Sequence, residues 1–318
     1  METAERYRRF ATTEVRGHSA TYDMLAARIA ADEELLALID RLPVSKRQPN
    51  LLLGAVRFLG GPVADYPAFR AWTLAAWDGV EQTMRGRFTQ TNEAGRCATL
   101  LPLLASLPQP LALIEVGASA GLCLYPDRYR YRYDDGPLLG PADGHVLLDC
   151  RTNGTAPLPR QLPTVAWRAG IDLNPLDVNS TDDVRWLESL VWPEQDDRLR
   201  RLRGAVQVAR AEPAHLVRGD LNRAVAELVA QVPDGATAVV FHSAVLAYLP
   251  TPERESFVET VRSLPCHWIS NEDPSVLPSV EDRLPRPAPP DQDVFILALD
   301  GQPVAFTGPH GQSLDWFA

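Results

Sequence analysis

Glycine and other small residues follow a strand-length apolar segment near the middle of the chain. Residues 111–116 read LALIEV, which includes Glu115, and the run Gly117-Ala118-Ser119-Ala120-Gly121 comes next. Such an apolar segment is typical of a central parallel strand that is buried on both faces. Glycine at its end lets the backbone turn sharply and approach a ligand. A helix that starts there would aim its free N–H groups at that ligand.

The loop has the residue spacing of two catalytic or binding motifs. Glu115, Gly117 and Gly121 form acidic-x-Gly-x-x-x-Gly, which resembles motif I of the class I S-adenosylmethionine-dependent methyltransferases. The same loop contains Gly-x-Ser-x-Gly, the nucleophile elbow of α/β-hydrolases, with Ser119 as the nucleophile. A tight turn between a strand and a helix with no ligand is a third interpretation. The loop alone leaves all three open.

Polar residues end the later segments that have strand character. Segment 165–173 contains Asp172 and precedes Asn174, 215–218 leads to Asp220, 236–241 to His242, and 266–270 to Asn271 and Glu272. The carboxyl ends of parallel strands meet at one edge of a sheet, where ligands bind. The ordinary pKa of histidine lies near neutrality, so His242 is a candidate base. Glu272 is a second catalytic candidate, and Asn271 is a candidate substrate contact.

Each of these residues also has a structural interpretation. His242 can be a buried histidine bonded to a loop carbonyl. Asp172 can hold a turn, and Asp220 can be the N-cap of the helix that follows it.

A polar segment, residues 89–96, interrupts the helical pattern of the first third of the chain. Asn92, Glu93 and Arg96 fall on one face if it is helical, since positions three and four apart are neighbours. We expect them to face the site, Glu93 as a further catalytic residue and Asn92 and Arg96 as substrate contacts. His310 near the C-terminus is another candidate substrate contact. The alternative is a helix start that is capped by Thr91.

Composition excludes several classes of function. The formal net charge is −10, and Lys46 is the only lysine, which argues against a broad nucleic-acid surface. The cysteines and histidines lack metal-ligand spacing, so we expect no metal site and no disulfide framework. No run of about 18 apolar residues occurs, and the N-terminus lacks the apolar region of a signal peptide. We therefore expect a cytoplasmic protein with a small-molecule substrate and no membrane or nucleic-acid partner.

Two kinds of pattern divide the chain. Residues 1–108 carry helical spacing only, and we expect an all-helical N-terminal lobe that covers the site and helps to bind the substrate. From 109 to 318 strands and helices alternate, which predicts an α/β domain with a mostly parallel sheet. Segments 294–299 and 303–307 flank Asp300-Gly301 and predict a closing antiparallel hairpin. We expect residues 128–163 to be an insertion, whose alternating Arg and Tyr residues predict an edge strand or a surface hairpin.

The order of five strand–helix steps and a closing hairpin resembles the Rossmann-like sheet of the class I methyltransferases. This resemblance implies S-adenosylmethionine as cofactor. It also implies that Glu115, Gly117, Ser119 and Gly121 line the methionine and ribose side. Asp172, assisted by Asn174, would accept the ribose hydroxyls, and Asp220 would meet the adenine amino group. The hydrolase interpretation fits less well, because residues before 111 read as helices and Pro126 follows the loop too closely for a long helix.

Several segments are similar to an uncharacterised, largely actinobacterial family, domain of unknown function 2332. They are QPNLLLGAVRFL, TQTNEAGRCATLLP, IEVGASAGLCL, GIDLNPLDV, LVRGDL, FHSAVLAYLP and WISNE. The resemblance covers nearly the whole chain and implies no settled activity. Our expectation is an S-adenosylmethionine-dependent methyltransferase acting on a small molecule. The alternatives are a non-catalytic nucleoside-binding protein on the same fold and a serine hydrolase that uses Ser119.

Overall fold

The chain folds into two compact units, which are described separately. The computed structural model describes residues 2–90, 92–290 and 292–317. The first unit comprises Met1–Thr91 and Asn179–Arg200, and the second comprises Asn92–Val178 and Arg201–Ala318. Residues 92–108, which we expected in the helical lobe, thus belong to the second unit. Residues 179–200, a later segment of the chain, complete the first unit.

The described residues of the first unit form only helices and turns. The helices are α1 (Thr3–Arg9), α2 (Ala20–Ile29), α3 (Glu33–Ile39), α4 (Pro49–Phe58), α5 (Tyr66–Ala75), α6 (Trp77–Gly86), α8 (Thr181–Leu190) and the start of α9 (Asp196–Ala211). Ser19 caps α2 as its sequence position suggests, because its side chain accepts a hydrogen bond from the Tyr22 N–H. Segment 179–200 packs into this unit through Trp186, whose ring contacts the ring of Phe58 edge-on, with 5.7 Å between the centroids.

The second unit is built on one ten-stranded sheet with the order β2-β3-β10-β9-β8-β7-β6-β1-β4-β5. The strands are β1 (Leu111–Val116), β2 (Arg130–Tyr133), β3 (Leu147–Thr152), β4 (Val165–Asp172), β5 (His215–Arg218), β6 (Thr237–Ser243), β7 (His267–Glu272), β8 (Phe295–Leu299), β9 (Gln302–Thr307) and β10 (Ser313–Trp316). Strands β5, β4, β1, β6 and β7 are parallel neighbours, whereas β7 to β10 pair antiparallel. The predicted α/β class, with a mostly parallel sheet and an antiparallel hairpin, is confirmed.

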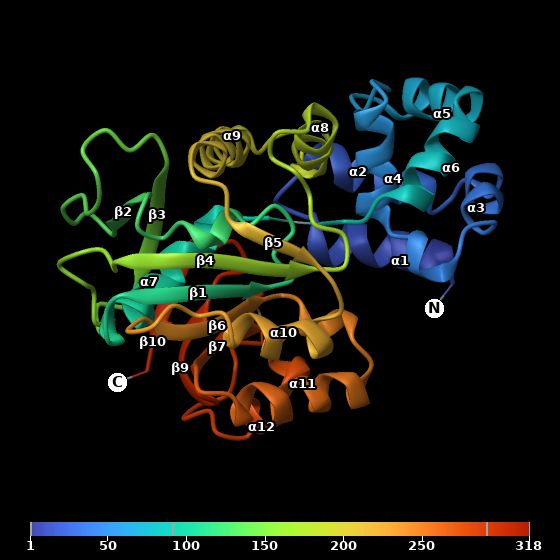
Figure 1. Cartoon of the computed structure of the whole chain (residues 1–318). Coiled ribbons are helices and arrows are strands. Elements are labelled where there is room, and N and C mark those ends of the chain that lie inside the picture. The colour runs from blue at the N-terminus through green and yellow to red at the C-terminus, as the bar shows by residue number, and fades with distance from the viewer. Residues whose placement is uncertain (1, 91, 291, 318) are drawn as a thin grey trace. The chain divides into compact units, whose positions relative to one another are not determined.

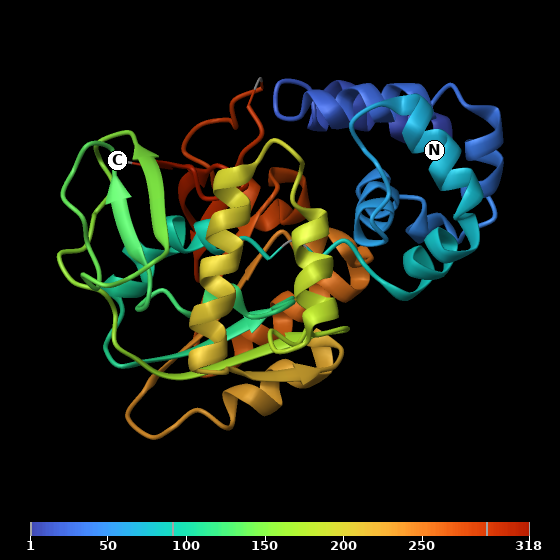
Figure 2. The same cartoon turned by 90° about the horizontal axis from the view of Figure 1, so that it is seen from above.

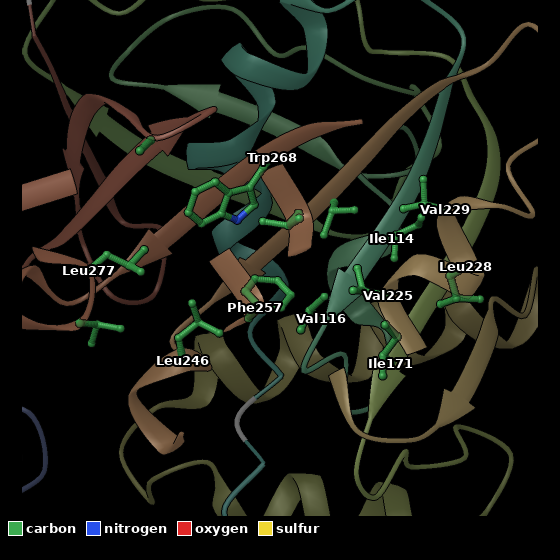
Figure 3. Packing of buried hydrophobic residues seen from close by; sticks show 14 of the residues in the cluster. Ile114, Val116, Ile171, Val225, Leu228, Val229, Leu246, Phe257, Trp268 and Leu277 are labelled. Atoms are coloured by element: carbon green, nitrogen blue, oxygen red, sulfur yellow. The ribbon is translucent and has the colours of Figure 1, made fainter. Parts of the chain in front are cut away.

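Helices cover one face of this sheet with a continuous apolar core. Figure 1 shows α10 (Leu221–Val229), α11 (Thr251–Ser263) and α12 (Pro278–Glu281) together on one side of the strands. Ile114 and Val116 of β1 pack there against residues such as Val225 and Phe257 (Figure 3). Side chains alternate along a strand, so Glu115 points to the opposite face.

The predicted insertion extends the main sheet, and within it the chain folds back once, where Tyr131 and Leu139 form an antiparallel bridge. Strands β2 and β3 lie side by side and pair in parallel, and β3 pairs in parallel with β10 (Figure 2). The Arg and Tyr alternation has a packing cause, because Tyr131 and Tyr133 are buried and donate hydrogen bonds to the carbonyls of Pro126 and Ala98. The expected edge strand is confirmed by the place of β2 at the end of the sheet, and the hairpin alternative is met only by the single bridge between Tyr131 and Leu139.

The turn after β1 also differs from the prediction. Only a single 3₁₀ turn, Leu122–Leu124, follows Gly121, and the described residues between β1 and β4 contain no α-helix. Pro126 comes two residues after that turn. A helix N-terminus that faces a ligand is therefore not part of this loop. None of the helices in the described part of the chain is long and apolar enough to cross a membrane.

Candidate functional site

The order of the parallel strands reverses at β1. The chain adds β4 and β5 on one side of β1 and then returns to add β6 and β7 on the other side. In open α/β sheets, ligands bind outside the carboxyl ends of the strands at such a switch point. Glu115, Asp172, His242 and Glu272 lie in the last two positions of their strands, so the sheet brings these predicted residues to one edge.

Asp172 fixes the small-residue loop that follows β1. Its two carboxylate oxygens accept hydrogen bonds from the Ser119 N–H (2.8 Å) and the Asn174 N–H (2.7 Å). The Ser119 carbonyl in turn accepts from the Leu176 N–H at 3.0 Å. Ser119, Asp172 and Asn174 thus lie together, and Asp172 has the turn-holding role that we considered as the alternative.

The loop glycines make room for protein side chains. Gly117 has φ +71°, and a Cβ at this position would overlap the side chain of Val245. Gly121 also has φ +71°, and its Cβ would lie 3.1 Å from a methyl group of Leu216. Both glycines are explained by the left-handed backbone and by packing, so neither is an argument for a ligand.

Glu115 is a buried carboxyl group with an incomplete set of partners. Only 6% of the residue is exposed, and its Oε2 atom has no hydrogen-bond partner among the described residues. Burial raises the pKa of Glu115 well above its usual value of 4.5, with further contributions from Cys123 and Asp172, while Arg96 opposes the shift. Glu115 therefore favours the neutral acid, which can both donate and accept a hydrogen bond.

Ser119, like Glu115, has a buried side-chain oxygen without a hydrogen-bond partner among the described residues. It is 3% exposed, and in the described part of the chain its Oγ finds no hydrogen-bond partner. Its backbone adopts φ +51°, which is uncommon for a residue with a Cβ. Buried polar atoms are paired in most native proteins, so two unpaired atoms on one strand–loop segment require an explanation.

His242 and Glu272 form a buried pair whose hydrogen bonds are all made within the protein. His242 Nδ1 lies 2.7 Å from Glu272 Oε1, and His242 Nε2 accepts a hydrogen bond from the indole N–H of Trp268 at 3.0 Å. The indole is only a donor, so Nε2 carries no proton and Nδ1–H donates to Glu272. His242 is fully buried. This geometry favours the structural interpretation of His242.

Glu272 also holds the turn after β6. Its Oε1 accepts hydrogen bonds from the N–H groups of Val245 (2.9 Å) and Leu246 (3.1 Å). Ala244 just before them has φ +56°. Glu272 is thus a brace for the same loop whose Val245 packs on Gly117.

Asn271 and Arg96 converge on the end of β6. The Asn271 amide donates to Ser243 Oγ at 2.9 Å, and its oxygen accepts from Thr307 Oγ1 at 2.7 Å. Arg96 donates to the carbonyls of Ser243 (2.9 Å) and Pro309 (2.8 Å). His310 belongs to the loop that contacts this region, and its carbonyl lies against Gly95.

Asn92 and Glu93 lie beside the glycine loop within the sheet unit. Asn92 Oδ1 accepts a hydrogen bond from the Leu122 N–H at 2.8 Å. Glu93 is 3% exposed, accepts from the Gly95 N–H and pairs with Arg201 Nε, both at 2.9 Å. Both residues therefore hold local structure. Thr91, the alternative helix cap, lies outside the described residues.

Asp220 is not brought to the glycine loop. It is exposed and caps α10, because its carboxylate accepts a hydrogen bond from the Asn222 N–H at 2.9 Å. This is the N-cap role that we considered as the alternative. Among the described residues, no group of three or more His, Cys, Asp or Glu side chains could hold a metal ion.

Three residues of this region have no signal in the sequence. Cys123 lies beside Glu115, and Cys97 with burial raises the pKa of the Cys123 thiol well above its usual range. Trp268 and Val245 complete the surroundings of His242 and Gly117. They come from segments distant in sequence, so their roles depend on tertiary contacts that spacing does not predict.

The chain matches the sequence model of an uncharacterised protein family conserved in bacteria, DUF2332, over residues 4–316. Comparison with curated proteins gives no match.

Proposed function

We propose that this chain, which belongs to the uncharacterised bacterial family DUF2332, binds S-adenosylmethionine at the β1–β6 switch point and methylates a small molecule. One observation carries the proposal: Glu115 Oε2 and Ser119 Oγ are buried at the switch point, and neither has a partner among the described residues. A ligand that hydrogen-bonds to both would explain them. The five parallel strands β1, β4, β5, β6 and β7, numbered 1 to 5 as they follow in the chain, lie in the spatial order 3-2-1-4-5. Doubly wound sheets that bind nucleotides at the switch point have this order.

The polar groups at this edge fit a ligand with an amino-acid end and a ribose. A neutral Glu115 offers an O–H donor and an acceptor, and the Ser119 hydroxyl offers the same combination. Asp172 already holds the backbone N–H groups of the loop, and carboxylates are strong acceptors of hydroxyl hydrogen bonds, which suits a ribose. We propose that Glu115 and Ser119 hold the amino-acid end, and that Asp172 with Asn174 holds the ribose.

When bound, S-adenosylmethionine supplies an electrophilic methyl group. The contribution of this chain is then to align the acceptor with that group, and alignment alone can supply much of a rate enhancement. His242 and Glu272 keep the turn after β6 in place through their mutual hydrogen bond and the bonds of Glu272 to that turn. We therefore propose that they act by positioning. A net charge of −10 favours a small acceptor over nucleic acid.

A non-catalytic nucleoside-binding protein is the second candidate. It is favoured by the internal hydrogen bonds of the residues that we expected to catalyse, since His242 uses both ring nitrogens and Glu93 pairs with Arg201. The two candidates differ in turnover. Production of S-adenosylhomocysteine from S-adenosylmethionine, in the presence of a fractionated bacterial metabolite extract, would support the methyltransferase.

The hydrolase interpretation has one supporting feature and lacks a base. The φ of +51° at Ser119 resembles the strained turn of a nucleophile elbow. Within the described residues, however, Ser119 Oγ has no histidine or other partner that could activate it. Labelling by a fluorophosphonate that is lost in Ser119→Ala would reverse this assessment.

Calorimetric titration with S-adenosylhomocysteine tests the proposed function. We expect micromolar binding, which corresponds to about −8 kcal/mol. Asp172→Asn should weaken binding by about 1.5–3 kcal/mol, because a charge-assisted contact to the ribose is lost. Asp134→Asn is the matched control, because this carboxylate also accepts two hydrogen bonds, from Thr152, but lies at the end of β2, at the opposite edge of the sheet. No heat of binding at millimolar ligand would contradict the proposal.

A further inference from the structure

Arg96 is a buried cation without an anionic partner. The residue is 8% exposed, and its guanidinium donates only to two backbone carbonyls, of Pro309 and Ser243. No carboxylate of the described residues lies within ion-pair distance of it. Arg168, which is similarly buried in the same unit at 6% exposure, instead pairs with Asp127 and Glu212. Arg168 thus has two carboxylate partners, whereas the described residues offer the Arg96 guanidinium two carbonyls and the ring of Phe295, 5.8 Å away at its centroid, and no carboxylate.

This arrangement is costly unless something else supplies a negative charge. Burial of an ionised group is unfavourable when it is not paired, and two carbonyl acceptors satisfy only part of the five N–H donors of a guanidinium. Arg96 Nη2 makes no hydrogen bond to the described residues and is not one of their fully buried unpaired atoms, so a ligand can reach it. The two carbonyl bonds fix the plane of the guanidinium and leave this nitrogen available.

The position of Arg96 connects it to the candidate site. Ser243 ends β6, one of the two strands at the switch point, and Pro309 follows β9 on the same edge of the sheet. The positive charge of Arg96 acts on Glu115 and lowers the pKa of that carboxyl group, although burial has the larger, opposite effect. Glu115 therefore lies near Arg96 and does not neutralise it.

We propose that Arg96 is a carboxylate-binding residue of the candidate site, so that the ligand bound there carries a carboxylate. The planar fork of a guanidinium matches a carboxylate, and preordering by two backbone carbonyls lowers the entropy lost on binding. The inference rests on the proposed function for its location. The carboxylate can belong to the methyl acceptor or to the amino-acid end of the cofactor, and the two sources are separable by experiment.

The first measurement uses acetate as the probe and requires no cofactor. Acetate should raise the urea unfolding midpoint of the wild-type chain above that in chloride of equal ionic strength, because a ligand of the native state stabilises it. Arg96→Gln should abolish this difference, and Arg96→Lys should retain part of it, since lysine keeps the charge without the fork. Arg168→Lys is the control and should respond to acetate as the wild type does, because Arg168 is already paired.

The second measurement compares S-adenosylhomocysteine with its decarboxylated analogue by calorimetry. If Arg96 binds the cofactor carboxylate, the wild type should prefer S-adenosylhomocysteine by roughly 10- to 150-fold, and Arg96→Gln should remove the preference. If Arg96 binds the acceptor, Arg96→Gln should bind both compounds as the wild type does. Acetate should then still stabilise the wild-type chain saturated with S-adenosylhomocysteine.

The two measurements separate failure of this inference from failure of the proposed function. Absence of binding by S-adenosylhomocysteine to any variant would reject the cofactor, and the acetate comparison would still decide the role of Arg96. An acetate effect equal to that of chloride in the wild type, or equal in wild type and Arg96→Gln, would overturn the inference. If Arg96→Gln fails to fold, Arg96→Lys and the comparison of ligands on the wild type give the same decision.

Discussion

Two buried glutamates at neighbouring strand ends differ in how their carboxyl groups are used. Glu272 of β7 accepts hydrogen bonds from His242, from the Val245 N–H and from the Leu246 N–H. Glu115 of β1 lies at the same edge, and its Oε2 has no partner among the residues that the structure describes. Their exposed fractions are 2% and 6%, so burial does not distinguish them.

This difference in hydrogen bonding assigns Glu272 to the structural framework and Glu115 to the candidate site. A carboxylate that satisfies several buried N–H groups is required by the fold, because its loss leaves those donors unpaired. A buried carboxyl group with an unpaired oxygen lowers stability, and a ligand is the simplest reason to retain it. Residue type alone would reverse this assignment, since the His–Glu pair has the more familiar catalytic appearance.

The largest expected effect is the loss of the Glu272 brace. Glu272→Ala removes the acceptor of two backbone N–H groups and of the fully buried His242 Nδ1. We expect the free energy of unfolding to fall by about 3–5 kcal/mol, as when one partner of a buried polar pair is removed. Urea denaturation followed by tryptophan fluorescence measures this, since Trp268 contacts His242.

Glu272→Gln is the matched control for the brace. The amide keeps one oxygen acceptor and the volume of the side chain, so the loss should be smaller, about 1–2 kcal/mol. A loss in Glu272→Ala no larger than that in Glu115→Ala would show that the two glutamates do not differ as proposed.

The second prediction concerns the pH dependence that Glu115 contributes. Because its pKa in the folded chain is raised by burial, the folded state binds a proton that the unfolded state releases above about pH 4.5. The contribution of Glu115 to stability is therefore complete below that pH and is lost as the pH rises towards the raised pKa. The loss has a limiting slope of about 1.4 kcal/mol per pH unit.

Glu115→Gln makes this contribution measurable. The amide does not titrate, so the variant should gain stability relative to the wild type as the pH rises from 5 to 8, and should differ least near about pH 4.5. Urea unfolding of both proteins at each pH gives the difference. A difference that is independent of pH would show that Glu115 ionises in the folded chain as it does in water.

The sequence predicted the strands of the sheet because each has a local signature. Apolar runs of strand length gave β1, β4 and β6 within about two residues, and Asp300-Gly301 gave the hairpin, where both residues have positive φ. The prediction of a helix after the glycine loop was wrong. Leu122 and Leu124 are buried in a 3₁₀ turn, and the spacing of apolar residues did not distinguish this turn from a helix. The last strand, β10, was missed, and its four residues become a strand through pairing with β9 and β3.

The candidate site was predictable in place and only partly in chemistry. Strand ends identified Glu115, Asp172, His242 and Glu272, because the carboxyl edge follows from the order of the strands. The roles depend on partners, and these come from distant segments. Trp268 decides the tautomer of His242, although no local pattern marks it. Arg96 was expected on a separate helical lobe, and its uncompensated charge is visible only in three dimensions.

The smallest expected effect compares two serines, one without and one with a hydrogen-bond partner. Ser119→Ala removes a buried hydroxyl that has no hydrogen-bond partner among the described residues. Serine and alanine both carry a Cβ atom, so the backbone strain at φ +51° is the same in the wild type and the variant. Backbone strain therefore cancels, and the free energy of unfolding should change by less than about 1 kcal/mol. Ser243→Ala should lower the free energy of unfolding by about 1–3 kcal/mol, because the buried Asn271 amide loses its acceptor.

If Ser119 holds the ligand, Ser119→Ala should still weaken S-adenosylhomocysteine binding by about 0.5–1.5 kcal/mol in calorimetry. Unchanged affinity together with unchanged stability would remove Ser119 from the site, and the proposal would then depend on Glu115.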